Sequence, residues 1–141
     1  MATSLAVSED GAAILEFVLV LPIMLALIGG AFELGRILLV DAALEAGVRG
    51  GARYLARVPD PFCTPGCSPG AAHAVGLARE RILENTSLSP AQVRVAPLAD
   101  PGPGHVGLRA EADVAVDLLG WVGLAPTIRI SASHRESHVV E

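Results

Sequence analysis

A run of about 21 residues near the N-terminus, Ala12 to Phe32, carries one charged side chain, Glu16, among apolar residues, glycine and proline. A helix needs about 20 apolar residues to cross the hydrocarbon core of a bilayer, so this run predicts a single transmembrane helix over residues 12–36. A cleaved secretory signal would have a shorter apolar core, a basic region before it and an A-x-A site after it. Here the apolar run is too long, no basic region precedes it and no A-x-A site follows it. A buried core helix is also disfavoured, because the remaining chain is too small to wrap so long an apolar rod.

The remaining composition argues against a nucleic-acid binder and against an enzyme. The ten basic side chains are all arginine and are spread along a chain of net charge −5, whereas a nucleic-acid binder needs a clustered basic face. The sequence has no P-loop, no G-x-S-x-G and no dinucleotide-binding fingerprint, and nothing links its Ser, His and Asp residues into a triad. We therefore expect no catalytic residues and no cofactor.

Beyond the membrane run, residues 37–58 predict a continuation of the helix. Charged side chains recur there at intervals of four residues and form one stripe, which we interpret as a solvated face: Asp41, Glu45, Arg49, Arg53 and Arg57. Gly47, Gly50 and Gly51 each weaken a helix by about 1 kcal/mol relative to alanine. Either close packing against another element compensates for these glycines, or the helix bends there.

Two further features of the membrane run bear on its shape and association. Pro22 has no backbone donor, so we expect a kink or local unwinding near it. The pairs Ala26/Gly30 and Ala31/Gly35 have the small-xxx-small spacing that lets a second helix approach closely in a membrane. Alanine and glycine are common in this chain, so chance spacing is an equally weighted alternative.

Residues 59–141 predict a small α+β domain outside the membrane. A loop rich in turn formers covers residues 59–70, and apolar spacing after it predicts a helix over residues 71–84. Alternation of apolar and polar residues predicts about three strands of an antiparallel sheet, over 93–95, 106–118 and 127–133. Because such a sheet has one apolar face, we expect the second helix and the distal part of the long helix to cover it.

The pattern around Glu16 offers a reason for a carboxylate in this position. The stretch "GAAILEF", from Gly11 to Phe17, is a glycine, four apolar residues and Glu-Phe at the head of an apolar helix. This arrangement resembles the processing site of type IV prepilins, especially those of the IVb and Flp class. The alternative is a tolerated interfacial glutamate, which the helix dipole and the nearby headgroups would stabilise.

Later segments narrow the resemblance to one family. The pair Leu21-Pro22, the stretch "ELGR" ending at Arg36 and the stretch "GARYLA" beginning at Gly51 are similar to those of TadE-like proteins of the tight-adherence pilus system. The resemblance covers about the first 57 residues. It implies a minor pilin or pseudopilin that performs no chemistry itself.

The resemblance also implies processing and a set of partners. A prepilin peptidase would cut between Gly11 and Ala12 and remove the leader, residues 1–11. The freed amine of Ala12 would be largely cationic at neutral pH and would pair with Glu16 of a neighbouring subunit, so that Ala12, Glu16 and Phe17 carry assembly. The implied partners are the peptidase, other pilins or pseudopilins, the assembly platform and inner-membrane lipid, with no nucleic acid among them.

The charge distribution around the span conflicts with this resemblance. The leader has no arginine and contains Glu9 and Asp10, whereas arginines follow the span from Arg36 onward. By the positive-inside rule the distal domain would be cytoplasmic. The resemblance instead implies a single-pass protein of the bacterial inner membrane whose C-terminal domain, residues 59–141, faces the periplasm.

The two cysteines favour the periplasmic orientation. Cys63 and Cys67 bracket a turn sequence, and their spacing permits a small loop disulfide, which suits an oxidising compartment. Free thiols are one alternative. Metal ligation is another, although His73 is the only nearby candidate for a further ligand.

Two other classes of function stay open at this point. An uncleaved single-pass membrane protein with a periplasmic binding domain would make Gly11 and Glu16 incidental and would place specificity in the Cys63–Cys67 loop. A metal-dependent enzyme would use His134 and His138, which lie on one side of the last predicted strand but at a chain end, where solvated polar tails are usual.

Overall fold

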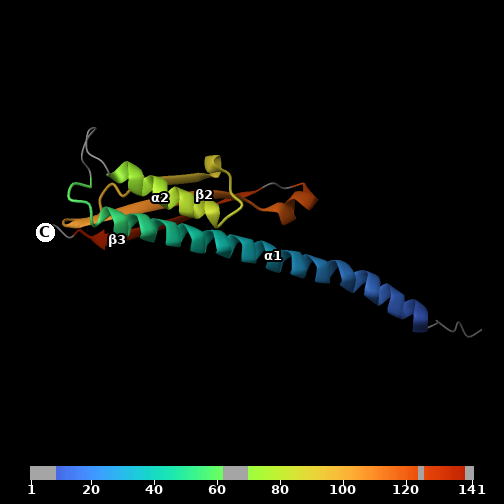
Figure 1. The fold of residues 1–141 in the computed structure, drawn as a ribbon. Coiled ribbons are helices and arrows are strands. Elements are labelled where there is room, and N and C mark those ends of the chain that lie inside the picture. The colour runs from blue at the N-terminus through green and yellow to red at the C-terminus, as the bar shows by residue number, and fades with distance from the viewer. Residues whose placement is uncertain (1–8, 62–69, 124–125, 139–141) are drawn as a thin grey trace, which may run out of the picture.

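A single long helix organises the molecule. The computed structural model describes residues 9–61, 70–123 and 126–138. Helix α1, Glu9–Leu55, has 47 residues, so it is about 70 Å long at 1.5 Å per residue. Figure 1 shows that the other elements pack along the distal part of α1, which the contact between Leu118 and Gly29 extends back to Gly29, while the part of the helix before Gly29 projects alone. The chain is therefore a rod with a small α+β domain on one end, which confirms the predicted fold class.

The helix is continuous across the predicted boundary between membrane span and extension. Pro22 lies inside α1 and the backbone stays helical through it, so the expected local unwinding is not seen there. Figure 1 shows a gentle curve in the N-terminal half of α1. The helix ends at Leu55, one turn before Pro59.

A second helix and a three-stranded sheet form the distal domain. Helix α2, Ala71–Glu84, has the predicted bounds, and the short 3-10 helix η1, Pro90–Gln92, leads into the sheet. The strands are antiparallel in the order β1-β2-β3, with bounds Val93–Pro97, His105–Ala115 and Thr127–Ser137. A second 3-10 helix, η2, Asp117–Val122, joins β2 to β3.

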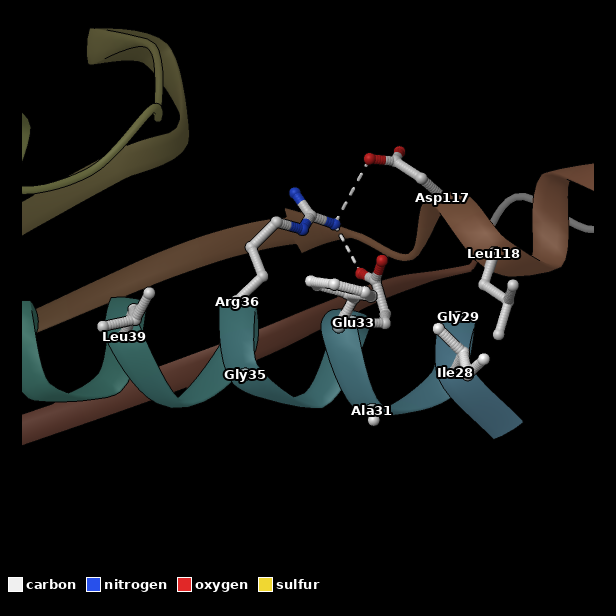
Figure 2. A pocket seen from close by; sticks show the side chains of 10 residues that line it. Ile28, Gly29, Ala31, Glu33, Gly35, Arg36, Leu39, Asp117 and Leu118 are labelled. Carbon is white, nitrogen blue, oxygen red and sulfur yellow. Dashed lines mark hydrogen bonds and ion pairs between the residues drawn. The ribbon is translucent and has the colours of Figure 1, made fainter. Parts of the chain in front are cut away.

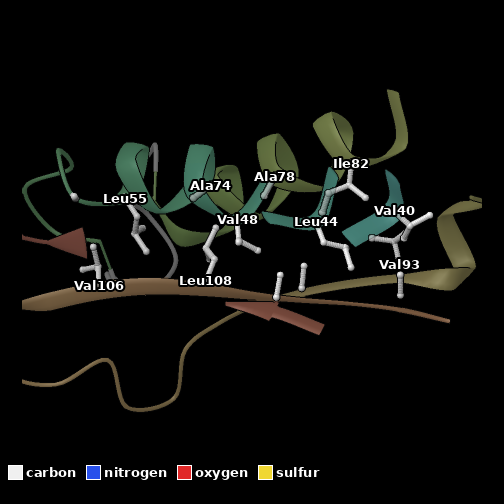
Figure 3. Close-up of a cluster of buried hydrophobic side chains, with 14 of the residues drawn as sticks. Val40, Leu44, Val48, Leu55, Ala74, Ala78, Ile82, Val93, Val106 and Leu108 are labelled. Carbon is white, nitrogen blue, oxygen red and sulfur yellow. The ribbon is translucent and has the colours of Figure 1, made fainter. Parts of the chain in front are cut away.

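The apolar face of the sheet is covered by the distal half of α1 and by α2, as predicted. Alternate residues of β2 are buried from Val106 to Val114, and they meet Leu44 and Leu55 of α1 and Ile82 of α2 (Figure 3). Fully burying a side chain of this size contributes about 1.5–3 kcal/mol. The core thus lies only in the distal half of the rod, and none of it involves the N-terminal half of α1.

Close packing of α1 against α2 accounts for two of the three glycines in the helix extension. A Cβ on Gly47 would lie 2.5 Å from Ile82 Cγ1 and 2.9 Å from the Ala78 carbonyl oxygen. A Cβ on Gly51 would overlap Leu108 and lie 2.9 Å from the Ala74 carbonyl oxygen. The first of the two predicted explanations therefore holds, because the glycines let the backbones of the two helices come together.

The opposite face of the sheet is polar and charged. Asp113 on the central strand β2 pairs with Arg129 of β3 at 2.7 Å and with Arg94 of β1 at 3.1 Å. The hydrogen bond from Arg129 and the positive charges of both arginines hold the pKa of the Asp113 carboxyl below its usual value. This ion triad links all three strands across the solvent-facing surface.

Candidate assembly surface

The N-terminal part of α1 is an apolar surface without a cover. In residues 11–28, called the free segment below, every described side chain is exposed. Its large apolar residues are Ile14, Leu15, Phe17, Val18, Leu19, Val20, Leu21, Ile23, Met24, Leu25, Leu27 and Ile28. A soluble domain rarely exposes so much contiguous apolar surface, and α1 is long and apolar enough to cross a membrane. The free segment therefore requires either lipid or other helices around it.

Glu16 lies on this apolar surface, and its carboxylate is unpaired among the described residues. It is exposed, as is its neighbour Phe17, and no described residue forms a hydrogen bond or an ion pair with it. An ionised carboxylate in an apolar setting is costly unless it is paired. Glu16 therefore needs either headgroups and water around it or a partner from outside the described residues.

The predicted cleavage site lies in the first turn of α1. The helix begins at Glu9, so the backbone on both sides of the bond between Gly11 and Ala12 is helical. The first four N–H groups of a helix have no intrahelical partner, and helix ends fray readily. Opening this turn into an extended strand for a peptidase costs little compared with opening a bond in mid-helix.

The glycines of the predicted span, residues 12–36, differ in what lies beside them. Beside Gly30 and Gly35 there is open space, with no atom within 4 Å of a Cβ placed on either. Gly29 behaves differently, because its Cβ would lie 2.8 Å from Leu118 Cδ1 of η2. Sequence spacing pointed to Ala26, Gly30, Ala31 and Gly35 and missed Gly29, whose contact residue is nearly ninety positions away. The predicted pairs thus remain available to a second helix.

Arg36 joins the long helix to the distal domain. Its guanidinium lies 2.5 Å from Glu33 Oε1 and 3.5 Å from Asp117 Oδ2 (Figure 2). It also donates a hydrogen bond to the carbonyl oxygen of Ala115. Glu33 and Arg36 are the charged residues of the "ELGR" stretch. Their contacts fasten the end of β2 and the start of η2 to α1 at the point where the apolar run stops.

The charged stripe on the helix extension runs beside strand β3. Glu45 and Arg49 are exposed and 3.9 Å apart, in the i,i+4 arrangement. Arg53 is also exposed, and it reaches across to Glu136 of β3 at 3.5 Å. The predicted solvated face is therefore correct for these residues, with the addition of one cross-element ion pair.

The histidines at the end of β3 have structural partners. His134 Nε2 lies 3.3 Å from Glu136, and His138 Nε2 donates a hydrogen bond to the Val58 carbonyl oxygen at 2.8 Å. Within residues 9–61, 70–123 and 126–138, no group of three His, Cys, Asp or Glu side chains is placed to hold a metal ion. Cys63 and Cys67 lie outside the described residues, so their predicted disulfide stays a prediction.

Comparison with known proteins assigns the long helix to a family. Residues 11–53 match the family described as TadE-like protein, so the chain carries a TadE-like domain over this range. The match confirms the resemblance predicted from sequence. It begins at Gly11 and includes the free segment, the Arg36 contacts and the two glycines that pack against α2. No curated protein and no solved structure matches the chain.

Proposed function

We propose that this chain, through its TadE-like domain at residues 11–53, acts as a minor pilin or pseudopilin in assembly of a tight-adherence (Flp-type) pilus or a related secretion apparatus. One observation carries the proposal. The family match starts at the glycine of the predicted processing site and continues along a helix whose apolar surface nothing in the described chain covers. A helix of this kind is a component for assembly, and the role is non-enzymatic.

Before assembly, lipid covers the free segment. The TadE-like helix lies in the bacterial inner membrane as a single span, and the distal domain, residues 59–141, faces the periplasm. The division of the molecule supports this arrangement, because the buried core and the ion pairs between elements all lie C-terminal to Gly29. The apolar half can therefore sit in lipid without disturbing the folded half.

Processing by a prepilin peptidase between Gly11 and Ala12 would give Glu16 its partner. The new amine of Ala12 carries a positive charge at neutral pH, and a neighbouring subunit presents its own Glu16 in an apolar environment. A buried pair of this kind adds little net stability, but leaving one member unpaired is costly, so the pair sets the stagger between subunits. The open pairs Ala26/Gly30 and Ala31/Gly35 allow the neighbouring helix to approach closely.

The intact mass and the N-terminal sequence of the protein extracted from native bacterial membranes test this proposal. A chain that begins at Ala12, and that keeps Met1 when the prepilin peptidase is deleted, is the expected result. A chain that keeps residues 1–11 in cells with an active peptidase would contradict it. That result would favour an uncleaved single-pass protein whose distal domain binds a periplasmic ligand.

A further inference from the structure

The 3-10 helix η2 lies against α1 inside the apolar run, on the membrane side of the charged cluster at Arg36. Leu118, its second residue, meets α1 at Gly29, where an added Cβ would come within 2.8 Å of Leu118 Cδ1. The residue before it, Asp117, forms an ion pair with Arg36, which lies about two turns further along α1 than Gly29. Figure 2 shows this order along the helix, with Asp117 beside Arg36 and Leu118 beside Gly29.

The position of Gly29 along α1 fixes the depth of this contact. If the hydrocarbon core takes the 20 residues that end at Phe32, Gly29 lies three residues inside it, or about 4.5 Å below its edge. Arg36 and Glu33 then lie at or beyond the edge, at the level of the headgroups. The contact between η2 and Gly29 is therefore at the boundary between headgroups and acyl chains.

The sequence of this connection suits that depth. Residues 118–123 read "LLGWVG", with no charged side chain, whereas Asp117 before them is charged. Leu118 is 36% exposed even with its contact to α1, so part of its apolar surface has no cover in the described chain. A tryptophan next to leucines is the composition found in the interfacial belts of membrane proteins.

Backbone hydrogen bonding in the connection explains why η2 would stay at the level of the headgroups and not enter the hydrocarbon core. The N–H of Val116 donates to the Pro126 carbonyl oxygen at 3.0 Å and closes the base of the connection. The N–H of Gly123 donates to the Gly120 carbonyl oxygen at 3.1 Å. A short 3-10 helix leaves several backbone groups without an internal partner, and these are tolerated among headgroups and water but not in the hydrocarbon core.

We propose that η2 inserts into the headgroup region of the leaflet that receives the C-terminal end of the α1 span, and so anchors the distal domain to that bilayer surface. The ligand is the phospholipid interface itself. We prefer lipid over a second copy of the chain as the ligand for two reasons. The apolar surface of η2 is continuous with the apolar run of α1, and the charges of Glu33, Arg36 and Asp117 bound it at headgroup level. The inference depends on the proposed membrane span but not on the proposed role in pilus assembly.

The single tryptophan of the chain, Trp121, lies in η2 and reports on this insertion without labelling. The full chain is reconstituted into phosphatidylcholine vesicles that carry bromine either near the top or near the end of the acyl chains. We expect strong quenching of tryptophan fluorescence by the shallow bromines, weaker quenching by the deep ones, and little quenching by aqueous iodide. Free access of iodide with no effect of either brominated lipid would overturn the proposal.

Vesicle flotation and resistance to alkaline extraction, measured on the same samples, report separately on the α1 span. A chain that floats but shows no bromine quenching contradicts the anchor and leaves the span intact. Quenching should not depend on the protein-to-lipid ratio. Trp121 could instead be protected from iodide only at high protein density and show no quenching by brominated lipid. That result would contradict the lipid anchor and would indicate contact between copies of the chain.

A matched pair of substitutions separates insertion from general loss of structure. Leu118→Asp places a charge at the proposed depth and should abolish most of the bromine quenching. Leu77→Asp changes an exposed leucine of similar accessibility, 39% against 36%, on α2 and should leave the quenching unchanged. If Leu118→Asp unfolds the distal domain, the depth profile of the unmodified chain still decides the question.

Discussion

Gly51 of α1 and Ala74 of α2 are in contact through the backbone, since a Cβ on Gly51 would lie 2.9 Å from the Ala74 carbonyl oxygen. Gly35, sixteen residues earlier on the same helix, has no atom within 4 Å of the equivalent position. Two glycines of one helix therefore serve different purposes. Gly51 closes the fold of this chain, and Gly35 leaves a surface that the chain does not use for its own fold.

Gly51→Ala should destabilise the distal domain, because the added methyl group overpacks the junction of α1, α2 and β2 at a cost of about 1–3 kcal/mol. The gain of about 1 kcal/mol in helix propensity offsets only part of this cost. Thermal or denaturant unfolding of the full chain in detergent measures the change. Gly35→Ala is the control, and it should unfold at the same or a slightly higher temperature; equal behaviour of the two variants would contradict the packing role of Gly51.

Glu16→Ala should leave membrane insertion and cleavage after Gly11 largely intact but should strongly reduce incorporation into pili. In the proposed pairing, the amine of a neighbouring Ala12 then has no carboxylate to bind in an apolar environment. Immunoblots of sheared pili and of the membrane fraction, together with the intact mass, measure the two effects separately. Glu16→Asp, which keeps the charge, should retain part of the incorporation, and normal piliation in the alanine variant would refute the pairing.

Arg36→Ala should loosen the connection between β2 and β3 without unfolding the sheet. The substitution removes the contacts to Glu33, Asp117 and the Ala115 carbonyl oxygen at once, so the end of β2 and the start of η2 lose their polar attachment to α1 and keep only the apolar contact between Leu118 and Gly29. Hydrogen exchange followed by mass spectrometry should show faster exchange over residues 116–123 only. Arg49→Ala removes an exposed pair at 3.9 Å and should change little, because such pairs contribute about 0–1 kcal/mol. Unchanged exchange over residues 116–123 in Arg36→Ala would show that Arg36 does not hold η2.

The ion triad on the sheet should make stability depend on pH in the acidic range. The folded-state pKa of Asp113 is below its usual value, so the unfolded chain binds its proton first as the pH falls. The stabilisation is thus fully present above the usual aspartate range and is lost as the pH falls through the folded-state pKa. The melting temperature of Asp113→Asn should lie below that of the unmodified chain at pH 7, and the two should converge in acid.

Asp60→Asn is the matched control for this measurement, because Asp60 is exposed and lies outside the sheet. Its melting temperature should follow that of the unmodified chain at every pH. A constant difference between Asp113→Asn and the unmodified chain from pH 7 to acid would assign the effect to packing and not to charge.

Much of the fold could be predicted from the sequence because its signals are local. The bounds of α2 follow from the apolar spacing of Ala74, Ala78 and Ile82, which are all buried. The period of two from Val106 onward predicted β2 and the face that it buries. The length of the apolar run alone required a helix that stands apart from the core, and the spacing of Gly11 and Glu16 is typical of the family that residues 11–53 match.

The tertiary structure decided which small residues the chain uses for itself. Gly29, Gly30, Gly47 and Gly51 look alike in sequence, since each is a glycine in an apolar helix, yet only three of them meet another element of the chain. The ion pair between Arg36 and Asp117 could not be predicted either, because the two residues are far apart in sequence. Periodicity reports which face of an element is buried, but not what lies against it. Those contacts depend on how α1, α2 and the sheet pack together, and that packing separates the surface used for folding from the apolar surface that the described chain leaves uncovered.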